Sequence, residues 1–171
     1  MKKLLLIFTI LLTVFACKQK EEVQYSNPLV IRDGLLYEDS KSTKPYSGRH
    51  KSRMKDMKIE YEVVNGVREG DFIIYNSNDK IQMEGKMKNN KNNGLWKYYY
   101  PDGSLQTYGF YNHDVPDSIW KWYYQNGKVS EEGKYKNGIR DGEWRSYNST
   151  GSLSIVRLFK DDKLIDSTKV N

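Results

Sequence analysis

A 24-residue repeat runs without an insertion from residue 65 to residue 159. Aromatic residues and glycines return at the same place in each unit. The most regular columns are Phe72, Trp96, Trp120 and Trp144; Tyr75, Tyr99, Tyr123 and Tyr147; and Gly85, Gly109 and Gly133. A single unit of this length cannot bury its own apolar side, so neighbouring units must stack on one another. The repeat therefore predicts an elongated array.

Each unit is patterned as two strands joined by a turn. Residues 95–100 are rich in aromatic side chains, which suit a pleated, half-buried surface. Pro101-Asp102-Gly103 follows, and proline and glycine favour the two corners of a turn. Residues 104–111 then alternate, and no repeated segment has a 3.6-residue apolar period. We therefore predict an all-β fold, a single-layer antiparallel meander of hairpins of about 24 residues each.

The regions on either side of the four repeats carry weaker versions of the pattern. Residues 29–31 and 35–37 flank Arg32-Asp33-Gly34 and predict an opening hairpin. We interpret residues 29–64 as this hairpin plus a degenerate repeat with a capping role, because a terminal unit has a neighbour on one side only. Residues 160–171 are expected to form a C-terminal tail.

The first 28 residues differ from the rest of the chain. Lys2 and Lys3 precede a short apolar run, which predicts a signal peptide over residues 1–16. Cys17, the chain's one cysteine, follows Ala16 in a context that resembles the bacterial lipobox. This resemblance implies lipidation of Cys17 and a polar tether over residues 17–28. A free thiol, or a cysteine removed by a later cut, is the alternative.

The repeat unit resembles the variant MORN repeat. The motif is most complete in Tyr135-Lys136-Asn137-Gly138-Ile139-Arg140-Asp141-Gly142-Glu143-Trp144-Arg145-Ser146-Tyr147. The resemblance covers residues 65–159 and, more loosely, 29–64, while residues 89–94 and 113–118 depart from the motif. It implies β-hairpin repeats in a bacterial lipoprotein. Chains of this kind are often labelled antitoxin components of toxin–antitoxin systems, a label that comes with the resemblance alone.

Columns that change from unit to unit are candidates for binding. If the Pro101-Asp102-Gly103 turn carries a glycine bulge, Trp96 lies opposite Tyr108 and Tyr98 opposite Gln106. Six extra aromatic side chains then gather on one face: Tyr98, Tyr100, Tyr108, Phe110, Trp122 and Tyr124. Such a patch suggests a partner, although the rings can equally bury one another. On the opposite face Lys97, Lys121 and Arg145 form a row that either contacts an anionic surface or is a solvated ladder.

Charge and composition restrict the function classes. The formal charge is +6, and +4 remains after loss of Lys2 and Lys3, without a basic block. We therefore expect no nucleic-acid partner. The two histidines lie in unrelated units, and no nucleophile, metal-ligand or phosphate-loop motif is present. We expect a protein that is not an enzyme and that uses no cofactor and no metal.

The leading functional hypothesis is a lipid-anchored, non-enzymatic scaffold at the cell envelope. It would be an outer-membrane lipoprotein, periplasmic or surface-exposed, that binds a protein or another envelope macromolecule through its sheet. A cell-wall or glycan-binding module that uses surface aromatics is the first alternative. An antitoxin-like component that binds a toxin partner is the second.

Overall fold

The computed structural model describes residues 25–170, and the predicted signal peptide, Cys17 and most of the tether lie outside them. No helix in residues 25–170 is long and apolar enough to cross a membrane. The strands are β1 (Val30–Arg32), β2 (Leu35–Tyr37), β3 (Gly48–Met54), β4 (Met57–Val64), β5 (Val67–Tyr75), β6 (Ile81–Lys88), β7 (Lys91–Asn92), β8 (Gly94–Tyr99), β9 (Leu105–Asn112), β10 (Val115–Tyr123), β11 (Val129–Lys136), β12 (Ile139–Arg140), β13 (Gly142–Tyr147), β14 (Leu153–Lys160) and β15 (Lys163–Lys169).

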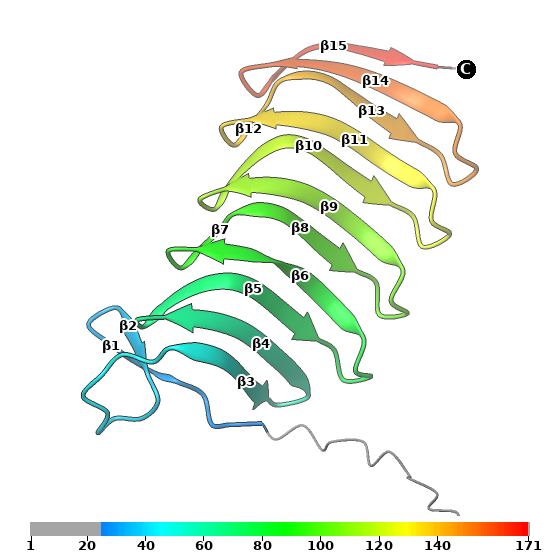
Figure 1. The fold of residues 1–171 in the computed structure, drawn as a ribbon. Helices are drawn as coiled ribbons and strands as arrows, with labels where there is room; N and C mark the ends of the chain where they lie inside the picture. Colours follow the sequence, from blue (N-terminus) through cyan, green and yellow to red (C-terminus); the bar gives the residue numbers. More distant parts are fainter. Residues whose placement is uncertain (1–24, 171) are drawn as a thin grey trace, which may run out of the picture.

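These strands form one long antiparallel meander, which confirms the predicted fold class. In residues 25–170 a 13-stranded sheet runs in chain order from β3 at one end to β15 at the other, and β1 and β2 form a separate hairpin. Figure 1 shows the arched strands stacked as an elongated ladder, with the small hairpin beside the β3 end. Within the sheet each strand pairs with strands adjacent in sequence, except that β6 also pairs with β8 and β11 with β13, past the two-residue strands β7 and β12.

Each repeat carries a β-bulge just after its turn, and the predicted register is wrong for this reason. The turn itself forms as expected: the Gly103 amide donates to the Tyr100 carbonyl at 2.8 Å, with Gly103 at φ +90°. Tyr99 then pairs with Leu105 but Tyr98 with Thr107, so Gln106 is an extra residue. Trp96 consequently faces Gly109 instead of Tyr108. The same shift recurs after the turns that follow β5, β10 and β13.

The recurrent tryptophans and glycines form one packed row along the sheet. The side chains of Trp96, Trp120 and Trp144 are 1%, 6% and 4% exposed. Each indole lies on the glycine of the preceding strand: a Cβ added to Gly85 would stand 2.2 Å from the Trp96 ring. The Trp96 indole N–H donates to the Lys86 carbonyl at 3.0 Å, and the other two indoles repeat this bond. These columns therefore hold the scaffold together, as the sequence predicts.

Side chains at the turns tie each repeat to the next. The Tyr100 hydroxyl donates to the Tyr123 carbonyl at 2.6 Å, and Tyr124 makes the equivalent bond to Tyr147 at 2.7 Å. Asp102 accepts from the hydroxyl and amide of Ser104 and from Gln125 in the following turn. These bonds lower the pKa of Asp102 to about 2. Because these hydrogen bonds join successive repeats, the stability of each unit depends on its neighbours.

The N-terminal hairpin closes the first end of the row. Leu36 of β2 packs against Tyr61 and Val63 of β4, and all three side chains are buried. His50 of β3 is 3% exposed and lies between the rings of Tyr46 and Tyr61. Its Nδ1 is 3.2 Å from the Ser26 hydroxyl, and its buried Nε2 has no hydrogen-bond partner among residues 25–170. Residues 29–64 thus form the hairpin and first strands of the cap.

His50 is expected to make the stability of the cap sensitive to pH. Burial, helped by the charge of Arg68, holds the pKa of His50 below its usual 6.5. As the pH falls, His50 is protonated at a higher pH in the unfolded chain than in the folded chain. The free energy of unfolding should therefore fall with decreasing pH from about 6.5 to the folded pKa, by at most about 1.4 kcal/mol per pH unit.

Denaturation by urea between pH 7.5 and pH 4.5 measures this dependence. The His50→Phe variant is the control, since it keeps an aromatic ring at that position but cannot titrate there. Subtracting its profile removes the contribution of the carboxylates. Parallel profiles for the two proteins below pH 6.5 would contradict the assignment.

The far end of the sheet is longer than expected from the sequence. The segment expected as a tail after residue 159 contributes β15, which pairs with β14. Every residue of β15 is exposed, and Ile165 is an extra residue between the pairs Phe159–Leu164 and Leu158–Asp166. A bulge together with Lys163, Asp166 and Lys169 is a common way to protect a terminal strand from pairing with other chains.

Candidate functional site

The single-layer sheet has two faces of different chemistry. We call the face that bears Trp96, Trp120 and Trp144 the aromatic face, and the one that bears Lys97, Lys121 and Arg145 the charged face. Side chains alternate along a strand, and directly paired residues share a face, so the register assigns every strand residue to one of them. The structure describes no bound group, and residues 25–170 contain no cluster of three or more metal-type ligands.

The six predicted patch residues do not share a face. Tyr98 and Trp122 project onto the aromatic face. Tyr108 and Phe110 pair with Lys97 and Leu95 and therefore lie on the charged face. The prediction of one continuous patch is therefore wrong. Its cause is the bulge at Gln106, because a one-residue shift moves every later side chain of β9 to the other face.

The aromatic-face members of the set are largely engaged within the sheet. Tyr98 and Tyr111 join their hydroxyls at 3.3 Å, and burial raises the pKa of Tyr98 well above its usual 10. The Trp122 ring packs between those of Trp120 and Trp144, with centroid separations of 5.9 and 5.6 Å. Tyr100 and Tyr124 follow β8 and β10 and make the ties between repeats. These four side chains therefore contact the repeated scaffold residues of the sheet.

The charged face carries an exposed apolar patch at the centre of the sheet. Leu95, Phe110 and Ile119 on β8, β9 and β10 are 38%, 41% and 53% exposed. Leu95 pairs directly with Phe110, and Ile119 alternates with Trp120 onto this same face. We call these three residues the central apolar patch. Three large apolar side chains open to solvent on adjacent strands are typical of an interaction surface.

The repeat itself shows that this patch is not required by the fold. One unit earlier, Asp71 and Lys86 occupy the positions of Leu95 and Phe110 and form an ion pair at 3.8 Å. One unit after Phe110 the equivalent residue is Lys134. Two units after Leu95 the equivalent residue is Glu143. This pair of positions therefore holds two charged residues in one unit, one charged residue in two units (Ile119–Lys134 and Glu143–Leu158), and two apolar residues in one.

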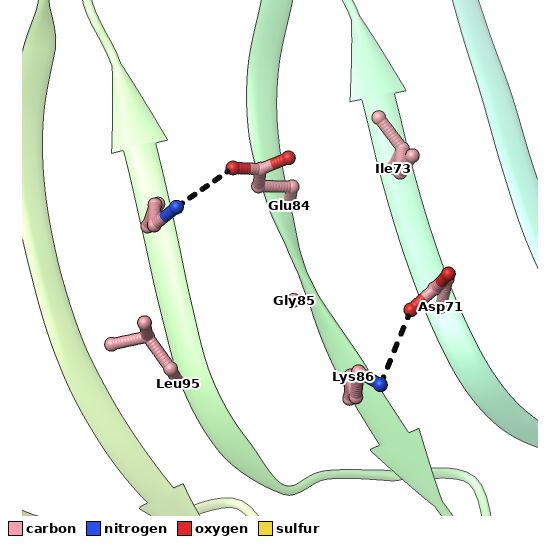
Figure 2. Close-up of a pocket in the computed structure, with 7 residues that line it drawn as sticks. Asp71, Ile73, Glu84, Gly85, Lys86 and Leu95 are labelled. Carbon is pink, nitrogen blue, oxygen red and sulfur yellow. Dashed lines mark hydrogen bonds and ion pairs between the residues drawn. The ribbon is translucent and has the colours of Figure 1, made fainter.

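A hollow of 490 Å³ adjoins the patch on its N-terminal side. Figure 2 shows its walls: Glu84 points toward the lysine of the neighbouring strand, Asp71 and Lys86 point toward one another, and Leu95 projects beside them. Ile73 and Gly85 complete the lining, so an apolar floor lies between two ion pairs. Leu95 belongs to both the hollow and the patch, which makes the two features one continuous surface.

The row predicted for anionic contact is paired with carboxylates in the sheet. Lys97 lies 3.4 Å from Glu84, Lys121 lies 2.9 Å from Glu132, and Arg145 pairs with Glu143. The Lys121 ammonium and the Tyr147 hydroxyl, 2.7 Å from Glu132, hold the pKa of Glu132 below its usual range. Hydrogen bonding to Glu132 likewise raises the pKa of Lys121. These ion pairs weaken the attraction of the three cations for an anionic surface. The predicted contact with such a surface stays a prediction.

Leu95 and Ile119 escaped the sequence-based selection, although their column carried a usable signal. Asp71, Leu95, Ile119 and Glu143 change from charged to apolar and back along the repeats. The selection followed aromatic enrichment and an assumed register, and neither criterion detects an aliphatic residue. A search for positions that turn apolar only in the central units would have found both.

Comparison with protein families locates known repeats in the chain. Residues 92–113, 116–137 and 140–161 match the family model described as MORN repeat variant. Successive matches begin 24 residues apart, as the repeat in the sequence does, and the unit that precedes residue 92 lies outside them. No curated protein matches the chain significantly. MORN repeats generally serve as modules that bind proteins or membranes, and proteins that contain them are typically not enzymes.

Proposed function

We propose that this protein is a lipid-anchored scaffold of the bacterial cell envelope that binds a protein partner through the central apolar patch. One observation carries the binding part: Leu95 and Phe110 are exposed where the preceding repeat has the Asp71–Lys86 ion pair. The fold accepts charged residues at these positions, so the exposed apolar side chains do not contribute to its stability. Their presence therefore favours a role in recognition.

The surface around the patch suits a protein partner. Apolar side chains at the centre and ion pairs around them reproduce the arrangement of protein interfaces, with a dry core and a polar rim. The hollow beside Leu95 provides a place for one large side chain of the partner, the usual setting of a binding hot spot. Tyr108 and Tyr123, whose ring centroids are 6.1 Å apart, extend the contact area on the same face.

The envelope part of the proposal rests on the sequence. The context of Cys17 supports acylation, and acyl chains contribute about 0.8 kcal/mol per buried CH₂ to membrane binding. The tether over residues 17–28 then separates the sheet from the membrane, so that the charged face is open to a partner. Cys17→Ser should move the protein from the membrane fraction to the soluble fraction. Membrane partitioning of that variant would refute the anchor.

The test of binding uses a double substitution that copies the chain's own sequence. Leu95→Asp with Phe110→Lys recreates the Asp71–Lys86 pair one repeat later, on a backbone that already accepts it. Leu158→Lys is the matched control, because it makes the same chemical change on this face near the end of the sheet, where Leu158 is 40% exposed. Affinity capture of the lipidated protein from cross-linked cells then compares the three proteins.

We expect the double variant to recover its partner at least tenfold less well than wild type, and Leu158→Lys to recover it fully. Circular dichroism and the thermal midpoint establish that the double variant is folded. Equal recovery by all three proteins would refute the assignment of the patch. Equal loss in both variants would place the contact elsewhere on the charged face.

A further inference from the structure

A polar cluster on the aromatic face, where the third and fourth repeats adjoin, breaks the repeat pattern in three columns. Glu131 stands where earlier units have Met83 and Thr107, and Ser146 stands where they have Ile74, Tyr98 and Trp122. Arg157 replaces the glycine column of Gly85, Gly109 and Gly133. Three columns that are otherwise mostly apolar or glycine thus become polar where two adjoining units meet, Glu131 in the third and Ser146 and Arg157 in the fourth.

The three side chains meet. The Arg157 Nη1 group donates to the Ser146 hydroxyl at 2.9 Å and lies 3.6 Å from Glu131 Oε1. The Ser146 hydroxyl donates to Glu131 at 3.1 Å. No indole covers Arg157, because β15 places Ser167 opposite it where an earlier unit supplies a tryptophan. The cluster is therefore partly open, with 31% of the Arg157 side chain and 39% of the Glu131 side chain exposed.

Glu131 and Arg157 of this cluster line an open cavity of 740 Å³. Its walls are the rings of Trp122, Tyr135, Trp144 and Phe159, together with Arg140 and Leu164. Arg140 lies over the Phe159 ring at 4.0 Å and pairs with Asp162 at 2.7 Å. The volume falls within the range of about 300–1,000 Å³ that is usual for small-molecule sites. The cavity lies on the opposite face from the central apolar patch.

The chemistry of the cavity selects among ligand classes. Each guanidinium is paired with a carboxylate, so the walls are close to electrically balanced and favour a neutral ligand over an anion. Arginine supplies only donors, glutamate only acceptors and serine both, which matches neighbouring hydroxyl groups that donate and accept at once. The aromatic walls offer flat apolar surfaces beside these groups. A pyranose ring combines both requirements, with C–H faces for the rings and hydroxyls at its edge.

We infer that this cavity is a binding site for a neutral saccharide, with Glu131 and Arg157 holding adjacent hydroxyls and the aromatic walls packing on the sugar ring. This saccharide site goes beyond the proposed protein contact, because it lies on the other face of the sheet and is formed by other residues. Failure of one proposal therefore leaves the other standing. The saccharide is defined by the apolar C–H face of its ring and by its pair of neighbouring hydroxyls.

The test follows the indole N–H resonances of ¹⁵N-labelled protein during titration with sugars. Glucose, galactose, N-acetylglucosamine and their β-1,4-linked disaccharides are the probes. Sorbitol is the negative control, because it has the hydroxyls without the ring. We expect at least one sugar to shift the resonances of Trp122 and Trp144 and to leave that of Trp96 in place. Sorbitol should shift none of them.

Variants taken from the chain's own repeats then test the residues. Glu131→Thr and Arg157→Gly introduce the residues of the preceding unit and should weaken binding at least tenfold. Glu143→Thr, on the charged face, is the matched control and should bind as wild type does. The inference is overturned if none of the sugars shifts Trp122 or Trp144, or if both variants keep wild-type affinity. In either case the polar cluster only closes the end of the aromatic row.

Discussion

Trp96→Ala should lower the free energy of unfolding by about 3–5 kcal/mol, the range for removing a large, well-packed aromatic side chain. Trp96 is 1% exposed and packs against Phe72 and Tyr111, with centroid separations of 5.7 and 6.2 Å. Its loss also removes one of the two donors to the Lys86 carbonyl, which keeps the Asn93 amide at 2.9 Å. Because the row is continuous, the vacancy would separate the first repeat from those that follow.

Equilibrium denaturation by urea, followed by far-ultraviolet circular dichroism, measures this loss. Ile119→Ala is the comparison, since its side chain is 53% exposed and surface substitutions usually change stability by no more than about 0.5 kcal/mol. A cost below about 1 kcal/mol for Trp96→Ala would show that the row does not hold the sheet together. A broadened transition would instead show that the two halves unfold separately.

Gly109→Ala should destabilise the protein by about 1–3 kcal/mol or more, although it adds a single methyl group. A Cβ at this position would stand 2.0 Å from the Trp120 ring, and the ring is held by its bond to the Phe110 carbonyl at 3.1 Å. The indole must therefore move or the strands must separate. Alanine is otherwise no worse than glycine in a strand, so the whole cost arises from this contact.

A double-mutant cycle with Trp120→Ala isolates the contact. Once the indole is gone, Gly109→Ala should cost little, because the three atoms nearest to the added Cβ all belong to the Trp120 ring. The two substitutions should therefore be strongly non-additive when unfolding free energies are compared. An additive pair would show that glycine is needed at position 109 for a reason other than the approach of Trp120.

The repeat made the fold predictable, whereas the faces depended on a detail that the sequence leaves hidden. Columns of tryptophan, tyrosine and glycine predict hairpins, their order and the aromatic row, because each column has one packing role. The bulge residues, Gln82, Gln106, Ser130 and Ser154, are ordinary polar residues without a bulge signature. One extra residue at each of these places moves the later side chains of the same strand to the opposite face of the sheet.

The candidate site was accessible to sequence reasoning only in part. Tyr108 and Phe110 were selected correctly as unusual, but the assumed register placed them beside Tyr98 and Trp122 instead of Leu95 and Ile119. The constraint that could have corrected this is steric. A tryptophan lying across the sheet needs a glycine on the same face of the preceding strand, as Trp120 has Gly109. The assumed register, which paired Trp96 with Tyr108, turns Gly109 to the opposite face.

The ties between turns have a consequence for how such a protein can change its length. The Tyr100 and Tyr124 hydroxyls, like the indoles of the aromatic row, each reach only the adjoining unit. Duplication or deletion of 24 residues within the array would therefore join surfaces that already fit. Gain or loss of a single residue would break the match instead. The length of the sheet can thus change in steps of whole repeat units.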